Sequence, residues 1–348
     1  MRLRLIQLHP LPSYRLAAAV QELVRRQFLL AKESEAQSRR RGAAEFTAAK
    51  TGPLQDTLAP LLAQPPQPTI ITFTPRPTFT LGRRQETSQL SPSEVDRLTA
   101  PLTVSSSQSH ASAVRFTPTI VSTLRGGLTT YHGPGQVVLW PVLDLKSPLF
   151  ANNGRPPLTV RAYSRLLETT TAEVLKRRYG LDAYTTGDPG LWVQSPQAAG
   201  GTDGPDYKEE RKIAALGVHL RRNISALGVA VNLDTPVKWG PSRGPSQRAS
   251  TGFASEETNP WLRFTPCGIE GKGVSSVADE GRHCFGSGLP ASWDLRPEPF
   301  AMQWAAVLAE QLGLQDPVID VADSKTVSKM LADARELLEA HNNIVGLP

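Results

Sequence analysis

Short apolar runs are spread over the first two thirds of the chain and are typical of strands. Those rich in Val, Ile and Leu predict strands at Arg2–Leu8, Thr69–Thr74, Thr119–Leu124, Gln136–Leu145, Leu191–Val193, Ile213–Arg221 and Ser225–Leu233. A short polar turn near Arg222–Asn223 separates the last two runs. These two runs therefore predict an antiparallel hairpin.

A repeat of 3.6 residues in the apolar positions indicates helices elsewhere. The repeat predicts helices at Tyr14–Lys32, Leu158–Tyr179, Phe300–Leu312 and Ser324–His341. Helices and strands follow one another without regular βαβ alternation. This order favours an α+β (mixed α/β) fold, a central mixed sheet flanked by helices, over a Rossmann fold.

Polar segments rich in Gly, Pro and Ser interrupt this pattern and predict loop insertions. They cover residues 33–67, 83–118, 195–210 and 240–259. Loops of this length are either functional or disordered, and their composition favours disordered surface loops. We therefore expect one catalytic domain over residues 1–320 with long insertions, followed by a C-terminal helical extension at 321–348.

Composition and charge narrow the function classes. The chain has 348 residues, 39% of them hydrophobic, and no apolar run near the roughly 20 residues that span a bilayer. Its formal charge is +6 and its pI about 9.4, yet it lacks an RNA-binding signature and a recognition-helix pattern. We expect a soluble monomer that binds neither nucleic acid nor membrane, and whose basic surface suits acidic protein partners.

The N-terminal residues have two interpretations. Arg2, Arg4 and Arg15 precede the first acidic residue, Glu22, which resembles a weak mitochondrial leader. The same residues also fit a first strand and helix. The two cysteines are too few for a disulfide framework and indicate a reducing compartment.

Cys267, in "FTPCGIEGKG", is the first candidate for chemistry. A buried apolar role is the plain alternative, but a side chain between Pro and Gly tends to project from a turn. A projecting thiol becomes a nucleophile when a nearby lysine stabilises its thiolate. Cys284, in "GRHCFG", is the rival; with His283 it falls short of a zinc site, so we expect no metal.

Lys212 opens the apolar run "KIAALGVHL", although a surface lysine continuing "YKEERK" is the simpler interpretation. Small residues follow in this run, in Ala215-Leu216-Gly217, and in its hairpin partner, in Gly228-Val229-Ala230. They leave room for an apolar ligand to lie against both strands.

The stretch "RGGLTTYHGPGQ", residues 125–136, combines four glycines with Arg125 and His132 and predicts a backbone-lined pocket. His132 has three possible roles: general base, hydrogen-bond donor or loop-ordering residue. The stretch contains neither GxxxxGK[ST] nor GxGxxG, so it is not a nucleotide phosphate loop of either type.

Together these motifs resemble the lipoyl/octanoyl transferase family, the octanoyl-[acyl carrier protein]:protein N-octanoyltransferases. The resemblance rests on "RGGLTTYHGPGQVVLWPVLDL", "GLWV", "RKIAALGVHLRRNISALGVAVNLD" and "FTPCGIEGKGVSSV", in the family's order. It covers roughly Thr69 to Val277. It implies the catalytic fold of biotin and lipoate protein ligases.

The resemblance also implies roles and partners. Cys267 would form an acyl-enzyme thioester and Lys212 would stabilise its thiolate, with no cofactor. The expected acyl-binding residues are Arg125, Gly126, Gly127, Leu128, Thr129, Thr130, Tyr131, His132, Ala215, Leu216, Gly217, Gly228, Val229 and Ala230. Octanoyl-acyl carrier protein would be the donor. Lipoyl domains of 2-oxoacid dehydrogenase E2 subunits and glycine cleavage H protein would be the acceptors.

Some residues depart from the family pattern, and other functions stay open. Thr265 stands where asparagine is usual and Trp140 where tyrosine is usual. The long insertions suit a fungal member acting in the mitochondrial matrix; the cytoplasm is the alternative. Three other functions remain: an ATP-dependent lipoate or biotin protein ligase of the same fold, a cysteine hydrolase using Cys267 and His132, and a catalytically inactive scaffold for lipoyl domains.

Overall fold

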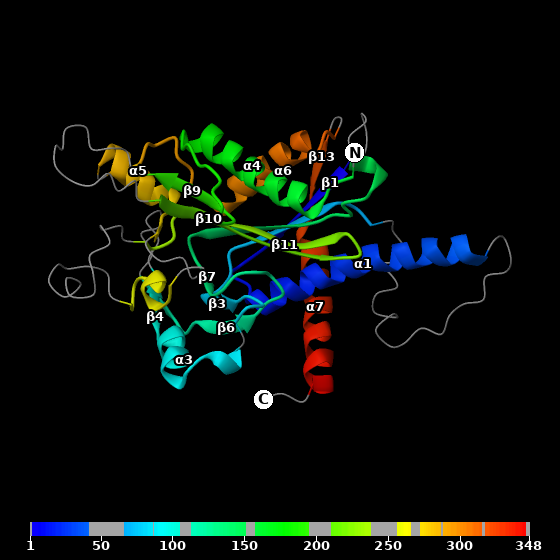
Figure 1. The fold of residues 1–348 in the computed structure, drawn as a ribbon, viewed down its shortest axis with the longest axis horizontal. Coiled ribbons are helices and arrows are strands. Elements are labelled where there is room, and N and C mark those ends of the chain that lie inside the picture. The colour runs from blue at the N-terminus through cyan, green and yellow to red at the C-terminus, as the bar shows by residue number, and fades with distance from the viewer. Residues whose placement is uncertain are drawn as a thin grey trace.

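In a computed structural model the described residues form one eight-stranded main sheet covered by helices on both faces, with a smaller β-sheet region below it (Figure 1). The described residues are 2–41, 66–85, 87–104, 113–150, 157–194, 210–237, 256–265, 272–286, 288–314 and 317–345.

The main sheet has the strand order β12-β10-β11-β8-β2-β1-β13, and β9 also pairs with β10. Its strands are β1 (Arg2–Leu8), β2 (Thr69–Phe73), β8 (Gln136–Val142), β9 (Leu191–Gln194), β10 (Glu210–Arg221), β11 (Ile224–Asn232), β12 (Gly273–Val274) and β13 (Val318–Val321). β1 pairs in parallel with β2 and β13, whereas β8 is antiparallel to β2 and β11. The sheet is therefore mixed, as the sequence predicts.

The predicted hairpin is confirmed. β10 and β11 pair antiparallel with Gly217 opposite Gly228. The turn residues Arg222 and Asn223 both have positive φ, 51° and 65°. Two such residues form the turn that matches the twist of paired strands, so the polar pair sets the register of the hairpin.

Helices cover the main sheet on both faces, and its central strands bury alternate residues toward one face and the other. One hydrophobic cluster joins the sheet to α4 (Val160–Tyr179), α5 (Val277–Phe285) and α6 (Pro297–Gln311). The other joins it to α1 (Tyr14–Arg41) and α7 (Ser324–Val345). We call these faces the α4 face and the α1 face. Figure 1 shows α4 and α6 above the sheet and α1 and α7 below it.

The prediction of a disordered loop at residues 83–118 is wrong for the described part of this segment. Its described part is ordered into η1 (Thr87–Gln89), α3 (Pro92–Thr99), β4 (Leu102–Val104) and β5 (Val114–Phe116), not a disordered loop. Ser91 and Glu94 form a capping box that starts α3. Buried Leu98 and Leu102 join a third cluster with Phe79, so a few apolar residues suffice to order a polar segment.

Other boundaries also differ from the prediction. α1 continues past Lys32 to Arg41, into the first predicted insertion. Three strands are absent from the sequence prediction, β3 (Thr78–Leu81), β7 (Thr130–His132) and β13, because each is too short to show a period. β3 pairs with β6 (Thr119–Ser122) and β7 in the smaller sheet. Residues 195–209 and 240–255 lie outside the described ranges.

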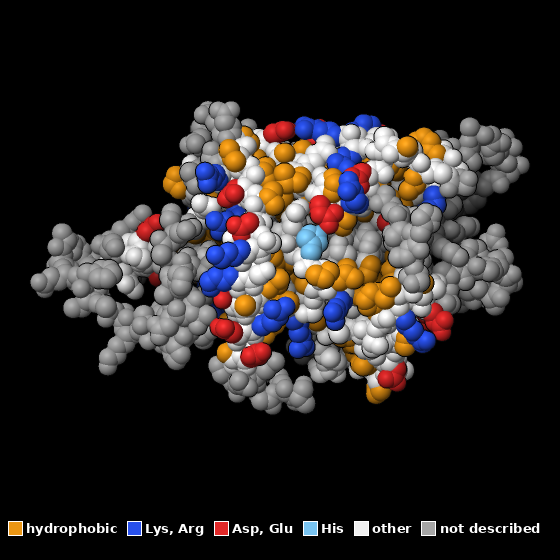
Figure 2. Space-filling view, turned by 180° about the vertical axis from the view of Figure 1, so that it is seen from behind, with side chains coloured by type: hydrophobic (Ala, Val, Ile, Leu, Met, Phe, Trp, Pro, Cys, Tyr) orange, Lys and Arg blue, Asp and Glu red, His pale blue; other side chains and the backbone are white. Residues whose placement is uncertain are grey.

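The predicted C-terminal extension contacts the rest of the fold. The division at residue 320 lies inside β13, which pairs with β1, and Met330 and Ala334 of α7 are buried against the α1 face. Acidic, basic and apolar side chains are interspersed over the surface seen from behind (Figure 2). Among the described residues no helix has the length and apolarity needed to cross a membrane.

Candidate functional site

A cavity of about 740 Å³ lies where α4, the β10–β11 hairpin, the start of α1 and the 125–132 segment meet. The lining residues are Tyr14, Arg84, Arg125, Gly126, Gly127, Thr130, His132, Trp140, Arg161, Ser164, Arg165, Glu168, Thr185, Thr186, Gly187, Asp188, Pro189, Lys212, Ala215, Leu216, Gly217, Val218, Leu227, Gly228, Val229 and Ala230. These segments are far apart in the sequence, and their meeting gives the cavity both a polar and an apolar part.

Arg125 organises the glycine-rich wall. Its Nη2 donates to the carbonyl and hydroxyl of Thr80 at 2.6 and 2.9 Å. Its Nη1 donates to the carbonyls of Gly126 and Leu128 at 2.9 and 2.7 Å. A planar guanidinium can hold several acceptors at once. Arg125 therefore ties β3 to the loop that lines the cavity.

His132 is buried in the cavity wall and belongs to a chain of hydrogen bonds. The amide nitrogen of Gln136 donates to Asn232 Oδ1 at 2.8 Å, and Asn232 Nδ2 donates to the Ser275 carbonyl at 2.9 Å. The side-chain oxygen of Gln136, Oε1, lies 3.0 Å from His132 Nδ1. Because the Gln136 amide nitrogen already donates elsewhere, Oε1 accepts the hydrogen bond from His132. His132 Nδ1 carries the proton and Nε2 is the acceptor.

The charge of His132 follows from its surroundings. Burial, together with the nearby Arg125 guanidinium, lowers the pKa of His132 to about 3. The ring stacks on Tyr14 with centroids 5.4 Å apart. A neutral imidazole in this position is a hydrogen-bond acceptor and not a cation at neutral pH.

Aromatic rings form the apolar part of the cavity. Trp140 packs edge-on to Tyr14 and to Phe73, with centroids 5.2 and 4.7 Å apart. Burial raises the pKa of the Tyr14 phenol. Tyr14 and Trp140, on α1 and β8, therefore offer a cavity wall without a charge of their own.

Lys212 lies at the start of β10, on the polar side of the cavity. Its Nζ donates to the Pro189 carbonyl at 3.1 Å and lies 4.6 Å from the centre of the Trp192 ring. Its own carbonyl accepts the Ser275 N–H at 3.0 Å. Lys212 is 7% exposed, so it belongs to the cavity wall, held from both ends, and is not a solvated surface lysine.

Two glycines of the hairpin let other parts of the protein pack closely against both strands. A Cβ atom at Gly228 would lie 2.1 Å from the Leu139 carbonyl oxygen. A Cβ atom at Gly217 would lie 2.9 Å from Cδ of Arg125. These glycines therefore allow β8 and the Arg125 side chain to approach the hairpin.

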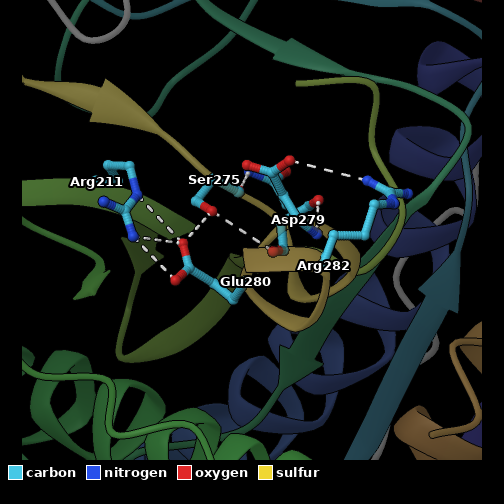
Figure 3. A network of polar contacts seen from close by, with 7 residues as sticks. Arg211, Ser275, Asp279, Glu280 and Arg282 are labelled. Carbon is cyan, nitrogen blue, oxygen red and sulfur yellow. Dashed lines mark hydrogen bonds and ion pairs between the residues drawn. The ribbon is translucent and has the colours of Figure 1, made fainter. Parts of the chain in front are cut away.

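A buried ion pair fixes the segment that follows Lys272 (Figure 3). Arg211, next to Lys212, donates from Nη2 to both carboxylate oxygens of Glu280 at 2.8 and 2.9 Å. The Ser275 hydroxyl also donates to Glu280. Both charged residues are under 5% exposed. The pair holds α5 and β12 against β10 beside Lys212.

Most predicted site residues line the cavity, namely Lys212, Arg125, Gly126, Gly127, Thr130, His132, Ala215, Leu216, Gly217, Gly228, Val229 and Ala230. Leu128, Thr129 and Tyr131 do not. Thr129 donates to Gln85 at 2.6 Å, and Tyr131 packs into the third hydrophobic cluster. These three support the wall from behind.

Cys267 lies outside the described residues. The described chain stops at Thr265 and resumes at Lys272. On one flank Phe264 packs on Phe79, with centroids 5.5 Å apart. On the other flank Lys272 binds the cavity residue Asp188, with Nζ 2.9 Å from Oδ2. The rival Cys284 is exposed on α5 and is not a lining residue.

The side chains that α4 contributes to the cavity were not predicted from the sequence. Arg161, Ser164, Arg165 and Glu168 line the cavity from positions i, i+3, i+4 and i+7 of one helix face. That spacing is readable in the sequence, but it indicates only a shared polar face. Its direction toward a cavity depends on how α4 packs on the sheet.

The described residues do not bring three His, Cys, Asp or Glu side chains together as a metal site would require. The polar donors of the cavity are mainly arginines, Lys212 and backbone groups. This set suits an anionic or carbonyl-containing ligand.

The chain is similar in sequence to one family of known proteins. The family model of the lipoyl protein ligase A/B catalytic domain matches residues 53–283. A Schizosaccharomyces pombe protein named a probable octanoyltransferase is 32% identical over 224 residues, which are 63% of this chain and 70% of that protein. The mitochondrial octanoyltransferase of Saccharomyces cerevisiae is 30% identical over 51% of this chain and 49% of its own length.

A third relative and one solved structure are also similar to this chain. The zebrafish mitochondrial octanoyl-[acyl-carrier-protein]:protein N-octanoyltransferase is 30% identical, over 59% of this chain and 63% of its own length. A bipartite lipoate protein ligase from Thermoplasma acidophilum superposes with a TM-score of 0.53 at 14% identity, covering 97% of this chain and 92% of that one. The structural likeness at this identity supports the fold alone.

Proposed function

Because the chain belongs to the lipoyl protein ligase A/B catalytic domain family, we propose that it transfers an octanoyl group from acyl carrier protein to a lysine of a lipoyl domain, through a thioester on Cys267. Its octanoyltransferase relatives support an acyltransferase activity. The observation that carries the proposal is the cavity itself. It joins a small-residue strand surface, a glycine-rich wall and the ammonium of Lys212.

The first half-reaction starts from a Cys267 thiolate beside the Lys212 ammonium. The thiolate attacks the donor thioester carbonyl, and the carrier thiolate leaves. That thiolate takes a proton from Lys212, which becomes a neutral amine. One thioester replaces another of similar energy, so this step needs no ATP.

In the second half-reaction the acceptor lysine attacks the acyl-enzyme as a neutral amine. The Cys267 thiolate leaves and the proton of the attacking nitrogen passes to Lys212, which restores the starting pair. An amide is more stable than a thioester, so this step runs downhill. Two half-reactions through one intermediate predict ping-pong kinetics.

The described flanks of Cys267 support this arrangement. Ser275 and Val274 pair with Lys212, and Lys272 binds Asp188 in the cavity lining. The Arg211–Glu280 ion pair keeps this strand and helix in place. The chain on the C-terminal side of Cys267 is thus anchored beside the lysine.

Acceptors and location are further parts of the proposal. We expect lipoyl domains of 2-oxoacid dehydrogenase E2 subunits and glycine cleavage H protein as acceptors. The mitochondrial names of the Saccharomyces cerevisiae and zebrafish relatives support a mitochondrial site of action. We propose the matrix as the compartment. The basic charge of the chain favours association with acidic carrier proteins.

The test is acyl transfer without ATP. Purified protein is incubated with octanoyl-acyl carrier protein, and its intact mass and peptide map are measured before and after a lipoyl domain is added. We expect one octanoyl group on Cys267, and its loss when the lipoyl domain becomes octanoylated. The Cys267→Ala variant should gain no octanoyl group.

Other outcomes identify the alternatives. A requirement for ATP and free octanoate would identify a ligase. Release of free octanoate without an acceptor would identify a hydrolase. Labelling of Cys284 would move the nucleophile to α5, and failure to acquire or transfer any acyl group would indicate a binding scaffold.

A further inference from the structure

Leu227, in the middle of β11, has a backbone conformation that is unusual for its residue type. Its φ is +62°, within the left-handed region that residues other than Gly and Asn seldom adopt. Such an outlier persists only where surrounding contacts hold it, and it often marks a functional site. Leu227 also lines the cavity.

The hydrogen bond of the Leu227 N–H shows what holds this conformation. The N–H leaves the strand ladder and donates to Oε1 of Gln21 at 3.1 Å. Gln21 is on α1 and only 4% exposed. The contact fixes the strand at the place where α1 crosses the hairpin.

The conformation changes the face on which the leucine lies. Residues of β11 alternate, with Val229 and Val231 in the cluster on the α4 face and Ala230 in the cluster on the α1 face. Regular alternation would place Leu227 with the valines. Instead it packs with the cluster on the α1 face.

On that α1 face Leu227 follows a row of small residues. Ala215 is paired with Ala230, and Gly217 with Gly228. All four line the cavity, and the aliphatic part of the Arg125 side chain packs against Gly217 beside them. We call this part of the cavity, along the small residues of the hairpin, the groove. Leu227 is the next lining residue toward the hairpin turn, so it supplies bulk where the small-residue row ends.

The positions of Lys212 and Leu227 along the hairpin indicate what the Leu227 side chain does. Lys212 lies at the opposite end of β10 from the hairpin turn. With the reacting carbonyl near Lys212, the apolar chain extends along the small residues toward Leu227. We propose that Leu227 closes the acyl groove and limits the length of the fatty chain that the protein transfers. This inference rests on the proposed function.

The experiment compares acyl carrier proteins loaded with octanoyl, decanoyl and dodecanoyl groups. The rate of acylation of Cys267 is measured by intact mass for wild type, Leu227→Gly and Leu227→Ala. Gly adopts positive φ without strain, so Leu227→Gly retains the backbone while removing the side chain. Leu220→Ala is the matched control, because Leu220 is on the same hairpin but packs on the α4 face and does not line the cavity.

We expect both Leu227 variants to raise the dodecanoyl-to-octanoyl rate ratio by about tenfold or more, the usual size of discrimination by methylene groups in an apolar pocket. Leu220→Ala should keep the wild-type ratio. Gln21→Ala removes the acceptor of the Leu227 N–H and should shift the ratio in the same direction, by less.

An unchanged ratio in both Leu227 variants would overturn the inference, as would an equal shift in Leu220→Ala. Failure of the proposed function is a separate result. It would show as the absence of an acyl group on Cys267 of the wild-type protein with every donor.

Discussion

The backbone N–H of Ser275 donates to the carbonyl of Lys212 at 3.0 Å. This bond joins the candidate catalytic lysine to the chain that follows Cys267. Ser275 also accepts, through its carbonyl, the hydrogen bond from Asn232 that continues to Gln136 and His132. The lysine and the histidine of the cavity are therefore tied to the same short segment.

Replacing Lys212 by methionine tests its role in proton transfer. Methionine keeps much of the length of the side chain and its contact with Trp192 but removes the ammonium. We expect Lys212→Met to slow octanoyl transfer by about 100-fold or more, the usual contribution of an acid–base group, with the fold unchanged by circular dichroism.

Lys272→Met is the comparison for that variant. Lys272 lies 4.5 Å from the centre of the same Trp192 ring and pairs with Asp188 and Glu210. We expect it to lose less than about tenfold, because no proton step is assigned to it. An equal decrease in the rate of octanoyl transfer in the two variants would indicate that Lys212 contributes positive charge to the cavity and does not transfer a proton.

Removing one partner of the buried ion pair should destabilise the protein. Glu280→Ala removes the carboxylate that pairs with Arg211, whose side chain is buried and only 2% exposed. We expect a loss of about 3–5 kcal/mol in the free energy of unfolding, measured by urea denaturation. Glu173→Ala is the control, since it breaks an exposed pair with Arg177 and should leave the denaturation midpoint nearly unchanged.

His132 should make the protein sensitive to acid. Its pKa is about 3 in the folded state and about 6.5 in an unfolded chain. Below about pH 6.5 the unfolded state binds one more proton than the folded state at this site, so folding stability falls as the pH falls. From pH 7 to 5 this amounts to about 2 kcal/mol.

The measurement is the free energy of unfolding of wild type and His132→Gln at pH 5, 6 and 7. The variant should show a smaller decrease over this range by about 2 kcal/mol. His9→Gln, at a half-exposed histidine, should follow the wild type. Parallel curves for wild type and His132→Gln would contradict the assignment of a buried neutral imidazole.

Two alanine substitutions distinguish a rigid from an adaptable neighbour. In Gly228→Ala the new methyl meets the backbone carbonyl of Leu139, which strand pairing holds in place. In Gly217→Ala it meets Cδ of the Arg125 side chain, which is not part of a paired strand and can yield by loosening its guanidinium hydrogen bonds. We expect a loss of about 3 kcal/mol for the first and about 1 kcal/mol for the second.

Thermal unfolding and donor KM check this pair of variants together. Gly217→Ala should raise the KM for the donor more than its small stability change suggests, because Arg125 organises the cavity wall. Equal destabilisation by the two substitutions would show that the contact with Arg125 is as rigid as the contact with Leu139.

The sequence by itself determined the features that depend on neighbouring residues. Two runs rich in Val, Ile and Leu and the polar pair Arg222–Asn223 between them specified the β10–β11 hairpin, since strand composition and turn chemistry are local. Glycine and small-residue spacing likewise indicated the segments that line the cavity. Short strands such as β7 and the helix α3 could not be predicted in this way. Their two or three apolar residues are too few to show a period, and it is packing into a distant cluster that orders them.

Tertiary structure alone decided which side chains meet. The Arg211–Glu280 pair joins residues 69 positions apart, and the relay from His132 to Ser275 crosses four segments of the chain. The turn of Leu227 onto the α1 face reverses what strand alternation predicts, because a glutamine on α1 captures its N–H. Contacts of this kind leave no local pattern in the sequence, since each depends on packing between distant segments.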